Sequence, residues 1–164
     1  MYKYKTSFPG NTNKKGKEVL IMSEDTVCLL KECNAGCKSA TNSMEQVQAF
    51  LKEGKLKDTI DHYNKEHIAL GDKCHKLLNE ADESEKDPHP MAKAFSWMST
   101  EMKLMANDEE TKISDIMVDG CKMGIKSLSK YLRQYQEASK ESKNIAQELI
   151  DLEKKFMTEL LAYL

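Results

Sequence analysis

The chain has 164 residues, enough for one domain with a substantial hydrophobic core. Its 25 basic and 27 acidic side chains nearly balance, so the composition indicates neither a nucleic-acid-binding surface nor a surface for anionic membranes. Charged residues make up 32% of the sequence against 7 glycines and 3 prolines, which favours long solvated helices over a turn-rich β fold. No apolar run approaches the roughly 18 residues that a membrane span needs. We therefore expect a cytoplasmic protein whose five cysteines are mostly reduced.

The N-terminal segment differs in composition from the rest of the chain. Residues 1–22 are rich in Lys, Asn, Gly and Thr, a composition typical of a disordered tail, and they lack the apolar core of a secretory signal. Ser23 can cap a helix, and Glu24 and Asp25 suit the positive end of one. We predict a tail over 1–22 and a helical domain over 23–164, with Met22 as the natural start of the protein.

Apolar residues at spacings of three and four predict two helices separated by a short turn at Gly54, a residue that commonly ends a helix. Such a short connection makes the pair an antiparallel hairpin. The predicted buried stripes are Leu30, Cys33, Cys37, Ala40, Met44, Val47 and Leu51 in the first helix, and Leu56, Ile60, Tyr63, His67, Leu70, Cys74 and Leu77 in the second.

A long connection follows, opening with the acidic, proline-containing stretch "NEADESEKDPHP". After Pro90 a methionine-rich stripe predicts an extra helix over 91–106, which we expect to cover the bundle or to form a partner or dimer surface. Asn107 and Glu110 form a capping-box pattern for the next helix. About thirty residues can return along a whole bundle, which permits the second and third long helices to run parallel.

The second half of the chain predicts another helical hairpin. The first of these two helices buries Ile113, Met117, Cys121, Gly124, Leu128, Tyr131 and Tyr135, and the second Ala146, Leu149, Glu153, Phe156, Leu160 and Tyr163. No Gly or Pro marks the boundary between them, which we place within residues 137–142. The predicted fold is all-α: a four-helix bundle of two antiparallel hairpins with an extra crossover helix.

The two halves repeat one short pattern, "AGCKSATNSM" at 35–44 and "DGCKMGIKSL" at 119–128. Each glycine costs roughly 1 kcal/mol relative to Ala inside a helix, so the repeated glycines indicate close backbone approach at that level. Superposing the halves brings these positions together: Gly36 with Gly120, Cys37 with Cys121, Met44 with Leu128, His67 with Glu153, and Leu70 with Phe156.

The four segments "LLKECNAGCKSATNSMEQV", "HYNKEHIALGDKCHKLL", "DIMVDGCKMGIKSLSKYL" and "QELIDLEKKFMTELLAYL" resemble bacterial ferritin-like domains, often described as stress-associated or rubrerythrin-like. The resemblance covers about residues 25–164. It implies a ferritin-like bundle in which the residue after each repeated glycine is typically Glu, an iron ligand. Here these positions are Cys37 and Cys121, and no Glu-x-x-His motif of a di-iron site is intact.

Three functions stay open from the residues. The first function is that of a divergent, non-enzymatic scaffold or homo-oligomer, which the resemblance would place in stress physiology. In this case Cys37 and Cys121 pack as small apolar side chains. The second is a structural site for one zinc or iron ion, because two thiolates, an imidazole and a carboxylate suit a tetrahedral ion: Cys37, His67, Cys121 and Glu153. A thiol-based redox protein is the third, through Cys33, Cys37 or Cys121. The sequence identifies no small-molecule substrate.

Overall fold

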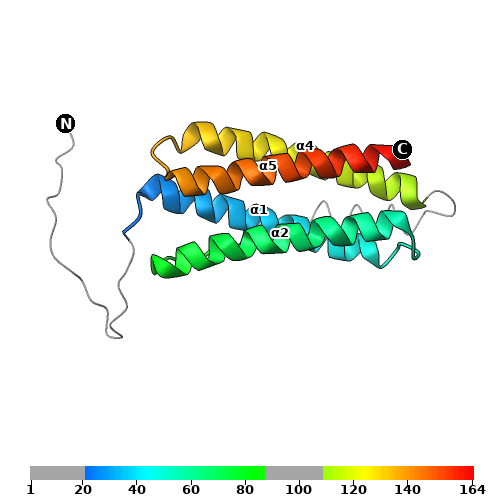
Figure 1. Ribbon diagram of the computed structural model, residues 1–164, viewed down its shortest axis with the longest axis horizontal. Coiled ribbons are helices and arrows are strands. Elements are labelled where there is room, and N and C mark those ends of the chain that lie inside the picture. The colour runs from blue at the N-terminus through cyan, green and yellow to red at the C-terminus, as the bar shows by residue number, and fades with distance from the viewer. Residues whose placement is uncertain (1–20, 88–108) are drawn as a thin grey trace, which may run out of the picture.

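The computed structural model describes residues 21–87 and 109–164, and the regular elements in these ranges are all helical (Figure 1). The elements are α1 (Glu24–Gln48), α2 (Lys55–Glu80), α4 (Glu109–Gln134), α5 (Lys140–Leu160) and the short 3-10 helix η1 (Leu161–Tyr163). None of the helices in these two ranges combines the length and the apolar character that crossing a membrane requires. The predicted all-α class is confirmed for the described part of the chain.

Several predictions fall outside the described residues and stay predictions. They concern the tail over residues 1–20, the methionine-rich helix over 91–106 and the helix cap at Asn107.

Local capping fixes where two of the helices begin. The Ser23 hydroxyl accepts a hydrogen bond from the Thr26 backbone N–H at 3.2 Å, which confirms the predicted start of α1. Ser139 caps α5 in the same way by accepting from the Ser142 N–H at 3.2 Å. The helix that follows starts at Lys140, inside the predicted window.

Two apolar clusters define how the helices run relative to one another. In one cluster the end of α1 and the start of α2 pack against the start of α4 and the end of α5, with Met44, Leu56, Ile113 and Phe156 among its members. In the other, the starts of α1 and α5 meet the ends of α2 and α4. Each hairpin is therefore antiparallel, and α2 runs parallel to α4, as the colour gradient in Figure 1 also shows.

The predicted stripes agree with the observed core at most positions. In α2 the stripe ends differently, because Leu78 is fully buried while Leu77 is half-buried. Tyr135 lies just beyond the end of α4 and is also half-buried. Glu153 points into the core and the neighbouring Leu152 is only half-buried, so the carboxylate occupies an inward position.

The chain that follows α2 is tied to α1 by ion pairs. Lys31 donates to Glu83 at 2.9 Å and Lys86 donates to Glu32 at 2.6 Å. Between these two pairs, Glu85 interacts with both Lys38 of α1 and His75 of α2. These contacts hold Glu83, Glu85 and Lys86 against the first hairpin.

Candidate site at the bundle centre

A buried His67–Glu153 pair joins the two hairpins at the bundle centre. His67 is 1% exposed and Glu153 is 8% exposed, and His67 Nε2 lies 3.1 Å from Glu153 Oε1. These residues come from α2 and α5, and the internal repeat predicts that they meet. A buried carboxylate requires such a partner, since an unpaired buried charge costs several kcal/mol.

The second ring nitrogen of His67 fixes the proton count of this pair. His67 Nδ1 lies 2.8 Å from the backbone oxygen of Tyr63, and a carbonyl oxygen can only accept, so Nδ1–H donates. If the imidazole is neutral, Nε2, which faces Glu153, carries a lone pair and no proton. One proton therefore lies between Nε2 and Oε1, on either the imidazole or the carboxyl group.

The two repeated cysteines flank the pair on different sides. The Cys121 thiol lies beside Glu153, and burial together with the negative charge of that carboxylate raises the thiol pKa. The pKa of Cys37 is also raised, first by burial and then by the charges of Cys74 and Glu153. Both thiols are 2% exposed and point into the bundle, as the repeat predicts.

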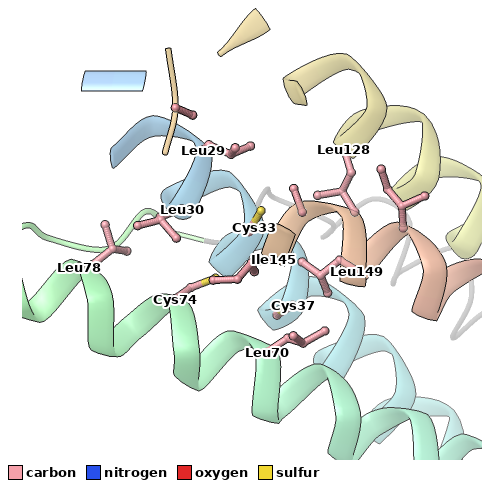
Figure 2. Close-up of a cluster of buried hydrophobic side chains, with 13 residues drawn as sticks. Leu29, Leu30, Cys33, Cys37, Leu70, Cys74, Leu78, Leu128, Ile145 and Leu149 are labelled. Atoms are coloured by element: carbon pink, nitrogen blue, oxygen red, sulfur yellow. The ribbon is translucent and has the colours of Figure 1, made fainter. Parts of the chain in front are cut away.

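Cys37 also belongs to a cluster of cysteines. Figure 2 shows Cys33 and Cys37 of α1 with Cys74 of α2 among the leucines of one core cluster. The pKa of the Cys33 thiol is raised by its interaction with Cys74 and by burial. All five cysteines of the chain lie in the described ranges and are free thiols. Neutral, buried thiols of this kind react slowly.

Of the four predicted metal ligands, the structure brings His67 and Glu153 into contact, and the charge of Glu153 contributes to the raised thiol pKa of both Cys37 and Cys121. Within residues 21–87 and 109–164, no three His, Cys, Asp or Glu side chains are arranged to hold a metal ion. The predicted single-ion site formed by Cys37, His67, Cys121 and Glu153 stays a prediction.

The expectation about the repeated glycines is wrong. A Cβ atom added at Gly36 or Gly120 would meet no atom of the described chain within 4 Å, so no described backbone segment approaches either glycine closely. Close approach occurs instead at Gly71, where a Cβ would lie 3.2 Å from Cys37 Cβ, and at Gly124, where it would lie 3.0 Å from Glu153 Oε1. The repeated glycines line an open space between helices, whereas Gly71 and Gly124 are the glycines that permit close packing.

That opening is a cavity of about 360 Å³ between α1 and α4. Small side chains on both helices create it, and apolar side chains dominate its interior. The α1 and α4 residues that line it include Gly36, Ser39, Ala40, Ser43, Met44, Met117, Gly120, Gly124, Ser127 and Leu128. His67, Glu153 and Phe156 line it from α2 and α5, so the buried pair faces the cavity.

A second, more open cavity of about 310 Å³ lies between α1 and α2. Its wall includes Cys37, His67, Gly71 and the charged side chains Lys38 and Glu85. His67 lines both cavities and therefore lies between two faces of the bundle.

Sequence reasoning missed the larger cavity. The available signal was the run of small residues at helical spacing on both helices, which includes Gly36, Ala40, Gly120 and Gly124. That run is consistent either with tight helix packing or with a hollow, and only the distance between the two helices distinguishes these outcomes.

Comparison with models of protein families, with curated proteins and with solved structures finds no match to this chain. The fold and the site together define an all-helical bundle with a buried His–Glu pair at the floor of an apolar cavity.

Proposed function

We propose that the protein is a binding protein that holds a small, mostly apolar molecule in the α1–α4 cavity. The observation that carries this proposal is the cavity itself, hollowed by Gly36 and Gly120, with the buried Glu153 at its floor. Its volume of about 360 Å³ falls within the range of ligand sites, which are typically apolar concavities with a few placed polar groups.

A fluorescent apolar dye tests this proposal. Nile red should bind the full chain saturably with one site per chain, and Gly120→Leu should weaken binding about tenfold or more, because the new side chain enters the cavity. Asp119→Leu is the matched control, since it adds the same side chain at the neighbouring exposed position of α4. Absence of saturable binding to the wild type, or equal affinity of the Gly120 variant, would refute the proposal.

Binding of a single metal ion is the second candidate. It is favoured by the contact between His67 Nε2 and Glu153 Oε1 at 3.1 Å, with the Cys121 thiol beside the carboxylate. An ion at this position would take the place of the shared proton, and Cys37 would complete the predicted set. Nitrogen, oxygen and sulfur donors together suit zinc or ferrous iron better than magnesium or calcium.

Elemental analysis of protein purified without added metal separates the two candidates. About one equivalent of zinc or iron, lost in Cys121→Ser and retained in Cys28→Ser, would support the metal site; Cys28 lies outside the group and serves as the control. Metal-free wild-type protein that also fails to take up zinc on titration would reject it.

Ferritin-like kinship and a non-enzymatic role form the remaining part of the proposal. Two antiparallel hairpins with α2 parallel to α4 agree with that kinship. Self-association belongs to the same proposal, and sedimentation of the full chain would test it: a monomer at all concentrations would reject the oligomer.

A further inference from the structure

In the cavity wall, the hydrogen-bond donors are engaged within the protein, whereas some acceptors remain available. Ser39 Oγ donates to the backbone oxygen of Ala35 at 2.9 Å, and Ser43 Oγ donates to that of Ser39 at 2.9 Å. His67 uses Nδ1 for Tyr63 and Nε2 for Glu153. These side chains therefore offer a ligand no free donor.

Other donors near the wall are also engaged or remote. The Tyr131 hydroxyl interacts with Glu32, whose negative charge, after burial, raises the Tyr131 pKa. Backbone N–H groups on both sides belong to helices. Ser127 lies exposed at the rim rather than inside. A ligand that brought only acceptors would leave them unpaired, which costs binding energy.

Acceptors remain in the wall. A carboxylate can accept about four hydrogen bonds, and His67 uses one position on Glu153. The hydroxyl oxygens of Ser39 and Ser43 keep lone pairs. Glu32 also lines the cavity but is already paired with Lys86, and no Lys or Arg occurs among the described residues that line the cavity.

We infer that the ligand of the α1–α4 cavity is an apolar amine, with its ammonium group at the Glu153 carboxylate and its hydrocarbon body against Met44, Met117 and Phe156; this inference rests on the proposed function. An ammonium group brings three donors and a positive charge, which matches a wall of acceptors. Here the shared proton is taken to reside on His67, which leaves Glu153 ionised, and charge-assisted hydrogen bonds to a buried carboxylate are roughly twice as strong as neutral ones. A carboxylate ligand would instead face like charges.

A matched series of ligands tests the inference on the wild-type chain. Octylamine, octanol and octanoate share one hydrocarbon length and differ only in the head group. The affinity of each ligand is measured by its displacement of Nile red from the full chain, at concentrations below those at which it forms micelles. We expect octylamine to bind about tenfold or more tightly than octanol, and octanoate to bind most weakly. Equal affinities for the amine and the alcohol would overturn the inference.

A variant assigns the preference to one side chain. Glu153→Gln keeps the size of the side chain and removes its charge, so the ratio of octylamine to octanol affinity should fall toward one, whatever the affinity of the variant for Nile red. Glu148→Gln is the control, because Glu148 lies exposed on the same helix and is 3.2 Å from Lys73 rather than in the cavity. An amine preference that survives Glu153→Gln would overturn the assignment.

The outcomes separate this inference from the function on which it depends. Nile red binding without any amine preference would reject the amine and leave the binding function intact. No saturable dye binding to the wild type would reject both. If Glu153→Gln fails to fold by circular dichroism, the three-ligand series on the wild type decides alone.

Discussion

Replacing the two repeated glycines by alanine should stabilise the protein. A Cβ at Gly36 or Gly120 would meet no described atom within 4 Å, so neither substitution introduces a clash. Alanine is favoured over glycine inside a helix by about 0.8–1.0 kcal/mol. Neither new methyl group meets a described side chain, so each gain should come from helix propensity alone. The double variant should gain about 2 kcal/mol in the free energy of unfolding.

The contrasting variant is Gly124→Ala, one turn beyond Gly120 on α4. Its Cβ would lie 3.0 Å from Glu153 Oε1, the oxygen that contacts His67, so the carboxylate has to move away. Loss of a buried hydrogen bond to a charged group costs about 1.5–3 kcal/mol, which exceeds the gain in helix propensity. Gly124→Ala should therefore lower the unfolding free energy by about 1 kcal/mol.

Urea unfolding followed by circular dichroism measures all of these variants on one scale. A gain of 1 kcal/mol should also raise Tm by about 2–4 °C in a chain of this size. If Gly36→Ala or Gly120→Ala lowers the unfolding free energy, the space beside these glycines is occupied in solution and the cavity argument fails. If all three variants behave alike, the distinction between open and tightly packed glycines is wrong.

Two further predictions concern titratable groups. Lys38 and His75 lower the pKa of Glu85 to about 2, so this carboxylate contributes stability above its ordinary pKa near 4.5, and the contribution is lost as the pH falls from there toward 2. Glu85→Gln should reduce the loss of unfolding free energy over that pH range by at most about 1 kcal/mol, since the group is partly exposed. An unchanged pH dependence would contradict the assignment. Cys28, the only half-buried thiol in the described chain, should react first with a thiol reagent, and the four buried cysteines only as the bundle opens. Rapid reaction of all five in the native protein would contradict their burial.

Much of the fold could be predicted because its determinants are local. The cap at Ser23 depends on the next three residues, and the apolar stripes depend on a periodicity of three and four. The predicted stripe in α2 differs from the observed core only at its last turn. There Leu77 was predicted to be buried, whereas Leu78 is the buried residue. Periodicity cannot distinguish adjacent leucines at a helix end.

The candidate site could be predicted in part. Matching the two halves of the chain placed His67 opposite Glu153, and the observed contact of 3.1 Å agrees with that match. The same match suggested that Cys37 and Cys121 share one centre; they belong to different apolar clusters, and the charge of Glu153 contributes to the raised pKa of both. Pseudo-symmetry predicts the level of a residue in the bundle more reliably than its direct neighbours, because helix rotation decides the neighbours.

The sequence by itself determined that this chain forms amphipathic helices in two hairpins, because caps, turns and spacing act over a few residues. Only the tertiary structure decided what the glycines do. Gly36 and Gly120 face a hollow while Gly71 and Gly124 face Cys37 and Glu153, and all four are helix glycines in the sequence. The physical reason is that a missing side chain permits either contact or empty space, and the separation of the helices, set by larger side chains elsewhere along them, decides which occurs.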